Sequence, residues 1–214
     1  MEWSLRLARE EDVPALEALI SLSVRGLHAQ HYSTAQMDDA LGSVFGVDRQ
    51  LIRDGTYFVV EHPSSAAAAT SGATGEGELV GCGGWSKRKT LFGSDHQTNR
   101  DDAELDPASD PARIRAFFVH PDWARQGIAR AILKKCEEAI CAAGFHSAEL
   151  AATLPGIPFY AAHHYVSGER SEVPLPNGLT LSVVKMSKTF PVAPTDGIKA
   201  APAGRPRRSA QRRE

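Results

Sequence analysis

At 214 residues the chain is long enough for one sizeable hydrophobic core and too short for two ordinary domains plus its linker-like stretches. Its hydrophobic content of 42% and charged content of 23% exclude a wholly disordered or membrane-embedded chain. No apolar run approaches the roughly 20 residues that span a bilayer. The N-terminal sequence MEWSLRLAREED is acidic where a signal peptide is basic and then apolar. We therefore expect a cytoplasmic protein with no membrane partner.

The net charge of −2 is unevenly distributed. Residues 191–214 carry a net charge of +4, which leaves −6 for the rest of the chain. An acidic body suits a cationic substrate, although a weak negative charge also serves solubility alone. Residues 191–214 have almost no apolar side chains, so we expect a disordered basic tail. A solvated terminus is favoured over a nucleic-acid-binding arm.

The cysteines and histidines do not form a metal-site pattern. Cys82, Cys136 and Cys141 contain no C-x-x-C, and their odd number argues against a disulfide framework. Cys136 and Cys141 are five residues apart on an expected helix and point in different directions, as do the adjacent His163 and His164. We expect buried thiols and no metal.

Hydrophobic periodicity predicts a strand, three helices and a second strand in the first part of the chain. Residues 3–7 alternate as a half-buried strand does. Apolar residues at spacings of three and four predict a helix over residues 13–27. A Ser-Thr pair can cap a short helix over residues 33–41, and a glycine ends a third over residues 47–55. The sequence TYFVVE, residues 56–61, is β-branched and aromatic, which is typical of a strand.

Two polar segments flank the next strand, which we place at residues 78–86. Residues 62–77 are low in complexity and rich in Ser, Ala, Thr and Gly, so we expect a flexible hairpin loop. The run GCGGWSK is not a phosphate-binding P-loop, because Lys87 lacks the preceding Gly and the following Ser or Thr. Its glycines indicate a bulge or a close backbone approach. Residues 87–112 form a long polar loop, which is either functional, as a lid, or disordered.

Residues 115–143 carry the strongest signal in the chain. They consist of an apolar strand, a tight loop with the sequence RQGIAR (residues 125–130) and an amphipathic helix that Gly144 ends. A helix start presents unpaired N–H groups and a partial positive charge, and the small Gly127 and Ala129 leave room for phosphate. This arrangement predicts a pyrophosphate site, with a simple tight turn as the alternative.

The segment VHPDWARQGIARAIL resembles the acetyl-CoA-binding segment of the GNAT superfamily of N-acetyltransferases. There, a strand ending in V-x-P leads into Q/R-x-x-G-x-G/A and then a helix. Gly127 and Ala129 match this motif, whereas Ala124 stands at the position of the first Gln or Arg. Arg125 and Arg130 remain to approach phosphate.

A second segment, ATLPGIPFYAAHHY, resembles the later GNAT signature N-x-x-A-x-x-F-Y-x-x-x-G-F. Phe159 and Tyr160 match its F-Y pair. Thr153 stands where Asn is usual, and His164 with Tyr165 replaces Gly-Phe. After a strand expected at residues 147–152, a hairpin over residues 166–187 turns at Asn-Gly and ends the domain.

The resemblance covers most of residues 1–190 and implies one GNAT acetyltransferase domain. Its fold class is α/β (α+β), a mixed and mostly antiparallel central sheet, flanked by helices, in which the central strand and the next strand splay apart. Where strands part, the backbone groups of Phe117, Phe118 and Val119 would pair with the pantetheine of acetyl-CoA. The other expected contacts to acetyl-CoA are Arg125, Gln126, Gly127, Ile128, Ala129, Arg130 and Thr153.

The family also implies the reaction, which is transfer of an acetyl group from acetyl-CoA to a primary amine of a small molecule or peptide by direct attack. A lysine-like amine has a pKa of ~10.4, so a base is useful, and Glu149 and Asp95 are candidates. Tyr160 would protonate the leaving thiolate. Tyr32 and Trp85 are candidate acceptor-site residues, with simple packing as the alternative for each.

Two other classes of function stay open. A domain of this fold could bind acyl-CoA as a non-catalytic sensor or interaction module, although retention of Tyr160 argues against it. A nucleic-acid-binding role would rest on the basic tail alone, since the body is acidic. The expected partners are the amine acceptor and a possible homodimer, and the sequence does not identify the acceptor.

Overall fold

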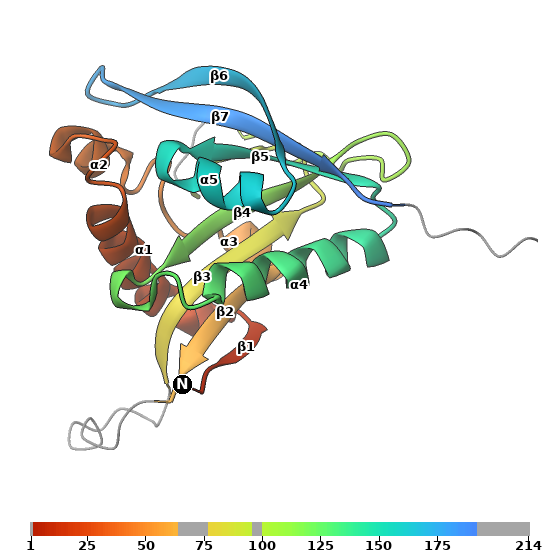
Figure 1. Ribbon diagram of the computed structural model, residues 1–214, viewed down its shortest axis with the longest axis horizontal. Coiled ribbons are helices and arrows are strands. Elements are labelled where there is room, and N and C mark those ends of the chain that lie inside the picture. Colours follow the sequence, from red (N-terminus) through yellow and green to blue (C-terminus); the bar gives the residue numbers. More distant parts are fainter. Residues whose placement is uncertain (1, 64–76, 96–99, 192–214) are drawn as a thin grey trace, which may run out of the picture.

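A seven-stranded sheet organises the protein (Figure 1). The computed structural model describes residues 2–63, 77–95 and 100–191. The strand order is β1-β2-β3-β4-β5-β7-β6, and all neighbours are antiparallel except β4 and β5, which are parallel. The strands are β1 (Ser4–Leu7), β2 (Tyr57–His62), β3 (Glu78–Ser86), β4 (Ala112–Val119), β5 (Ser147–Thr153), β6 (Val166–Pro174) and β7 (Thr180–Thr189).

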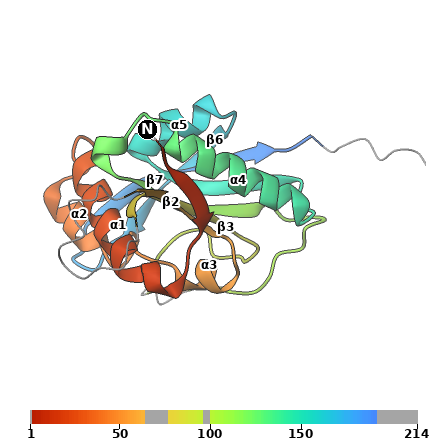
Figure 2. The ribbon, with the colours of Figure 1, turned by 90° about the horizontal axis from the view of Figure 1, so that it is seen from below.

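Helices cover both faces of this sheet (Figure 2). One face packs against α1 (Val13–Leu27), α2 (Thr34–Ala40) and α3 (Arg49–Arg53), and the other against α4 (Ile128–Ala142) and α5 (Ile157–Ala162). Short 3-10 turns lie at Glu10–Asp12, Pro121–Trp123 and Leu154–Gly156. No helix in residues 2–63, 77–95 and 100–191 is both long and apolar enough to cross a membrane.

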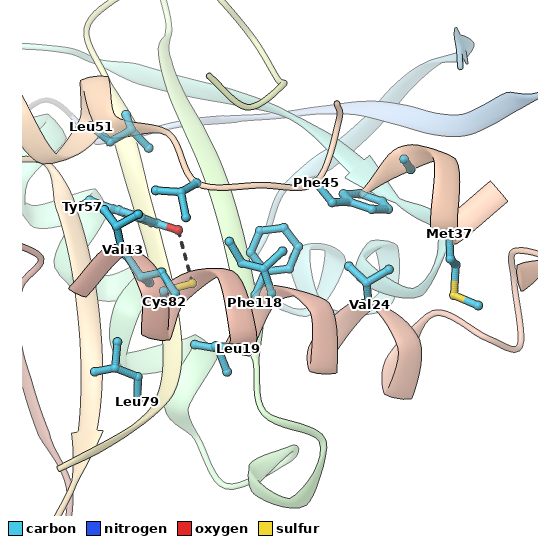
Figure 3. Close-up of a cluster of buried hydrophobic side chains, with 14 of the residues drawn as sticks. Val13, Leu19, Val24, Met37, Phe45, Leu51, Tyr57, Leu79, Cys82 and Phe118 are labelled. Atoms are coloured by element: carbon cyan, nitrogen blue, oxygen red, sulfur yellow. Dashed lines mark hydrogen bonds between the residues drawn. The ribbon is translucent and has the colours of Figure 1, made fainter. Parts of the chain in front are cut away.

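The sheet separates two hydrophobic cores, which we call the α1-side core and the α4-side core. The α1-side core joins the apolar stripe of α1 to β2, β3 and β4 (Figure 3). In it the Tyr57 hydroxyl donates to Cys82 Sγ at 3.3 Å, and the Phe45 and Phe118 rings meet edge to face at 6.1 Å. The α4-side core contains the helical row Ile128, Ile132, Cys136 and Ile140, all four buried, as its spacing predicts.

Glycines in β3 let α4 lie unusually close to the sheet. A Cβ added at Gly81 would come within 2.4 Å of Ile128 Cγ2, and one at Gly83 within 2.9 Å of Ile132 Cγ2. Ile128 is the first residue of α4. The glycines of GCGG therefore set the position of the N-terminus of α4, in agreement with the close approach expected from the sequence.

Local signals account for most element boundaries. Ser33 caps α2 through a reciprocal box in which its hydroxyl accepts from the Gln36 N–H and Gln36 Oε1 accepts from the Ser33 N–H. The Asn-Gly turn joins β6 and β7, with Gly178 at a φ of 84°. Helix α5 was not expected from periodicity. The low-complexity loop and the basic tail predicted from the sequence lie almost wholly outside the described residues.

Candidate active site

Strands β4 and β5 pair at one end only. Their ladder consists of two residue pairs, Ala112 with Ala148 and Arg113 with Glu149. Beyond these pairs the strands diverge and leave a cleft that residues 114–119 and 150–153 line from either side. The splay that the family resemblance implied is therefore present.

A bulge in β4 shapes the wall of this cleft. Cys82 and Gly84 of β3 face Phe118 and Arg115, so β4 carries one extra residue in this stretch. Ala116 lies there with a φ of 54°, and its carbonyl accepts from the Tyr57 hydroxyl at 3.4 Å. Side chains change faces at this point, because Ile114 and Phe117 both belong to the α4-side core. The bulge leaves Ala116 and Phe117 outside the regular ladder.

The cleft passes from one face of the sheet to the other. On the α4 side it is lined by Ala129 of the first turn of α4, by the turn at Pro155 and Gly156, and by Phe159 and Tyr160 of α5. On the α1 side it is lined by the end of α1 and by two loops, with Ser23, Leu27, His28, Val44, Phe45, Gly46, Leu91, Phe92 and Gly93.

The N-terminus of α4 offers bare backbone at the α4-side mouth. Gly127 is the N-cap residue, has a φ of 86°, and receives no capping side chain. A Cβ built there meets nothing within 4 Å. Arg125 and Arg130 are exposed on either side, and the Gln126 amide donates to the Asp122 carbonyl. The unpaired N–H groups and two cations make a site that fits a pyrophosphate.

The expected backbone contacts along β4 and β5 lie in the cleft wall. Phe117, Phe118, Val119 and Thr153 all line it. The Val119 N–H is already used, since it donates to Ser23 Oγ at 3.2 Å. Phe117 lies outside the β3 ladder because of the bulge.

Tyr160 lies on the α4 side of the cleft and is 8% exposed. Its ring meets Phe117 edge to face at 6.2 Å and Phe159 at 5.0 Å. Burial raises the pKa of its phenol above the usual 10, so the hydroxyl keeps its proton at neutral pH.

His28 lines the α1 side and was not singled out from the sequence. It is 8% exposed, and its Nδ1 is buried without a hydrogen-bond partner among the described residues. The ring is held by aromatic contacts, at 5.3 Å from Phe45 and 6.0 Å from Tyr32. Burial, with a smaller effect from His31, lowers the pKa of His28 from 6.5 to about 4. No sequence signal distinguishes it, since it is one histidine at the end of an amphipathic helix.

The structure does not bring two of the expected acceptor-site residues to the cleft. The Tyr32 hydroxyl donates to the Ser182 carbonyl at 2.6 Å and accepts from the Leu154 N–H at 2.9 Å, so it connects the α1–α2 loop to β7 and to the end of β5. Trp85 is buried in the α4-side core, edge to face with Phe145 at 6.1 Å. Neither is among the lining residues.

The two carboxylates considered as bases are committed elsewhere. Glu149 is 7% exposed and pairs with Arg113 of β4 and, at 2.7 Å, with Lys185 of β7. Asp95 accepts from the Arg49 N–H at 3.0 Å, at the start of α3. Neither lines the cleft.

Part of the long loop after β3 covers the α1-side mouth. Leu91, Phe92 and Gly93 line the cleft there. The Arg115 guanidinium holds this segment by donating to the Gly93 carbonyl at 2.7 Å, and it pairs with Asp48 at 2.9 Å. The position agrees with a lid, whereas Arg100, further along this loop, pairs with Asp48 at 3.1 Å.

Charge in the cleft differs from charge on the body. Among the described residues that line it there is no Asp, Glu or Lys, and the ionisable ones are His28, Arg115 and Tyr160. The acidic character of the body therefore does not extend into the cleft.

Comparison with known proteins gives a consistent family. A sequence profile of the acetyltransferase (GNAT) domain matches residues 53–167, more than half of the chain. No curated protein sequence matches the chain significantly.

Three solved structures illustrate the shared fold. A GCN5-related N-acetyltransferase, also described as a class-II aminotransferase, from Rhodopseudomonas palustris is 18% identical, with a TM-score of 0.60 over 89% of this chain and 97% of that chain. The PaiA N-acetyltransferase of Thermoplasma acidophilum, solved in complex with coenzyme A, is 12% identical, with a TM-score of 0.57 over 89% and 100%. The ribosomal-protein-S18-alanine N-acetyltransferase of Escherichia coli is 13% identical, with a TM-score of 0.50 over 91% and 98%.

Proposed function

Because this chain belongs to the GNAT acetyltransferases and is an acyltransferase of that family, we propose that it moves an acetyl group from acetyl-CoA to a primary amine by direct attack. The observation that carries the proposal is the cleft between β4 and β5, which is lined on one face of the sheet by the first turn of α4, next to the bare Gly127 N-cap, and on the other face by the end of α1. Two substrates can thus enter from opposite faces of the sheet and meet at the bulge in β4.

The α4 side suits acetyl-CoA. The pyrophosphate would lie on the N–H groups of the first turn of α4, where Gly127 leaves open space and Arg125 and Arg130 add positive charge. The pantetheine would run between the diverging strands and pair with backbone groups near Phe117 and Thr153, as a peptide does at a strand edge. The PaiA structure, which contains coenzyme A, supports this assignment by its fold alone.

The chemistry requires one bond to form and one to break. The amine nitrogen attacks the thioester carbonyl carbon, the C–N bond forms, and the C–S bond breaks. The nitrogen loses a proton and the sulfur gains one. Tyr160, protonated and buried beside the cleft, is the proposed donor to sulfur, and a backbone N–H at the bulge would stabilise the oxyanion.

The acceptor is a small molecule or a peptide. Structural relatives named for ribosomal-protein alanine and for N-acetylglutamate synthesis span both kinds, so the fold does not choose between them. The cytoplasmic location and the possible homodimer remain predictions. The alternative function, a non-catalytic acyl-CoA sensor, predicts binding of acetyl-CoA without release of free CoA in the presence of amines.

The test of the acetyl-CoA site is Gly127→Asp. A carboxylate at the N-cap would face the pyrophosphate and add like-charge repulsion in the space that the backbone leaves open. We expect the affinity for acetyl-CoA, measured by calorimetric titration, to fall at least 100-fold, a loss of about 3 kcal/mol.

The matched control is Gly178→Asp. Gly178 also has a positive φ and open space around an added Cβ, but it lies in the β6–β7 turn. It should carry the same backbone strain without loss of affinity. Unchanged binding by a folded Gly127→Asp variant would remove the cofactor assignment.

A further inference from the structure

The α1 side of the cleft has an apolar lining. Its side chains come from the end of α1, from the loop before α3 and from the loop after β3, and they include Leu27, Val44, Phe45, Leu91, Phe92 and Phe118. Phe45 lies between the His28 and Phe118 rings, in edge contact with both. An occupant of this half would be surrounded mainly by aliphatic and aromatic carbon.

None of the described residues that line this half carries a negative charge that could pair with an ammonium group. The cation nearest to this half is Arg115, which is 5% exposed and is neutralised by Asp48 at 2.9 Å. Its guanidinium also donates to the Gly93 carbonyl. Arg115 is therefore committed to the protein and has little capacity to bind an acceptor carboxylate.

His28 is the polar side chain of this half that has no such commitment. Its Nδ1 is enclosed and has no hydrogen-bond partner among the described residues, while Phe45 and Tyr32 fix the plane of the ring. A buried polar atom without a partner is costly, so its presence in a native protein calls for a reason such as a catalytic role, a bound water or a bound ligand.

We propose that the acceptor is a primary amine carried by an aromatic or aliphatic group, and that the uncharged His28 imidazole accepts a hydrogen bond from the amine N–H. This inference rests on the proposed acetyl transfer. It makes His28 a residue that determines acceptor specificity, and it disfavours acceptors that carry a second charge into the apolar half of the cleft.

The apolar lining favours the free amine over the ammonium ion, because burial of an unpaired charge is far more costly than burial of a neutral amine. The acceptor would release one proton to solvent on entry and bind as the free base. After attack, the second proton lost by nitrogen balances the proton gained by sulfur. His28 orients the lone pair of nitrogen and keeps no proton at the end of the cycle.

This route has a pH signature. The groups that face His28 are His31, whose charge disfavours protonation of His28, the neutral Tyr32, and the Arg115–Asp48 pair across the cleft. Since burial lowers the pKa of His28 to about 4, the ring stays neutral from about pH 5 upward. With saturating acetyl-CoA, kcat/KM for the amine should then rise about tenfold per pH unit from pH 7 to 9, following the fraction of free amine.

The first experiment compares isosteric acceptors with the full-length protein. Hexylamine and 1,5-diaminopentane have the same length and differ by a terminal methyl and a terminal ammonium. 2-Phenylethylamine and L-phenylalanine differ by a carboxylate. Release of CoA is measured at pH 8, and binding of acetyl-CoA is measured separately by calorimetry. We expect kcat/KM to favour the first member of each pair by about 30-fold or more.

The second experiment compares His28→Phe with His31→Phe. Phe keeps the ring contacts of His28 and removes both nitrogens, whereas His31 is exposed and does not line the cleft. We expect His28→Phe to lower kcat/KM for hexylamine about tenfold or more, with the Kd for acetyl-CoA within twofold of wild type. His28→Asn, which keeps a neutral acceptor, should recover part of the loss, and His31→Phe should behave as wild type.

The possible failures are distinguishable. A preference for 1,5-diaminopentane or L-phenylalanine, or a His28→Phe variant as active as wild type, would overturn this inference alone. Binding of acetyl-CoA without transfer to any of the four amines would favour the sensor alternative and overturn the proposed acetyl transfer together with this inference. A wild-type protein that does not bind acetyl-CoA would overturn the proposed function, and this inference with it.

Discussion

The Tyr160 hydroxyl can be tested as a proton donor without disturbing its ring. In Tyr160→Phe the contacts with Phe117 and Phe159 remain, and only the hydroxyl is lost. We expect the rate constant for acetyl transfer to fall by about 10²-fold, the lower end of general acid–base effects, because a thiolate also leaves unprotonated. Single-turnover measurement of the transfer step, with the Kd for acetyl-CoA unchanged, checks this.

Tyr165 provides the control for this experiment, and the burial of Tyr160 determines the expected pH dependence. Tyr165 is also buried, its ring is 5.7 Å from that of Tyr160, and it does not line the cleft, so Tyr165→Phe should retain the rate. Since burial raises the pKa of Tyr160, its ionisation should not lower activity below about pH 10. A Tyr160→Phe enzyme with the wild-type rate would return this residue to a packing role and favour the sensor alternative.

For single residues, the sequence identifies those that belong to a recognisable motif. It does not identify those whose properties come from their surroundings in the fold. Gly127 and Tyr160 were identifiable because their neighbours carry a family pattern, and both lie at the cleft or its mouth. His28 was not identifiable, because its character comes from burial beside Phe45, a residue 17 positions away in sequence. Trp85 was a candidate acceptor-site residue from its place at a strand end, with packing as the alternative, and it lies in the α4-side core against Phe145.

Among the contacts between elements, that between β3 and α4 leaves no room for one added carbon atom at Gly81. In Gly81→Ala the new Cβ would lie 2.4 Å from Ile128 Cγ2, a branched side chain with little freedom in a helix. The first turn of α4 must then move. We expect a loss of about 1 to 3 kcal/mol in the free energy of unfolding, measured in urea, and weaker binding of acetyl-CoA.

Two variants separate this contact from a general effect of glycine replacement. Gly168→Ala in β6 adds a Cβ that meets its nearest atom, the Lys185 carbonyl oxygen, at 3.4 Å, and it should cost much less. Adding Ile128→Ala to Gly81→Ala removes the clashing methyl and should restore part of the affinity for acetyl-CoA. Strictly additive losses in the double variant would contradict the proposed clash.

Element boundaries were predictable, whereas the relation between β4 and β5 was not derivable from periodicity. The strand expected at residues 78–86 is β3, and the helix expected after Gly127 is α4. The bulge at Ala116 has no local signal, since alanine rarely adopts a positive φ, and it was not predicted. Only the splay of the two strands was anticipated, through the family resemblance. The short α5 is fixed by packing of Tyr160 rather than by a repeating pattern.

For the molecule as a whole, a buried ion cluster connects three segments distant in sequence. Asp48 is fully buried, caps α3 through the Gln50 N–H, and pairs with Arg115 of β4 and with Arg100 at 3.1 Å. In Asp48→Asn the cap can persist while Arg115 is left as a buried, unpaired cation. We expect a loss of about 3 kcal/mol or more in the free energy of unfolding at pH 7.

The control is the double variant Asp48→Asn/Arg115→Met, which removes the unpaired cation. It should recover at least half of the loss in the free energy of unfolding, measured in urea. The reason is that this buried site tolerates an apolar side chain better than an unpaired charge. If the single and double variants were equally unstable, the cost would come from packing or from the loss of Arg100 pairing, and the cluster would not act through Arg115.

The net charge of the chain was a poor predictor of the charge in the cleft. A net charge of −6 outside the basic tail suggested a cationic substrate. Carboxylates such as Asp54 and Glu137 instead pair with Arg88 and Lys188 on the body, and none of the described residues that line the cleft is a carboxylate. Charge summed over a sequence carries no information on which face a side chain takes.

Glu149, suggested by sequence as a candidate base, joins neighbouring strands of the sheet instead. It lies where β4 and β5 still pair and binds cations on both neighbouring strands, Arg113 of β4 and Lys185 of β7. Glu149 therefore links the two halves of the sheet at the end where β4 and β5 still pair. These ion pairs lie outside the cleft and limit how far β4 and β5 separate at its other end. A wider acceptor could then be admitted by weakening the ion pairs of Glu149 rather than by replacing residues that line the pocket.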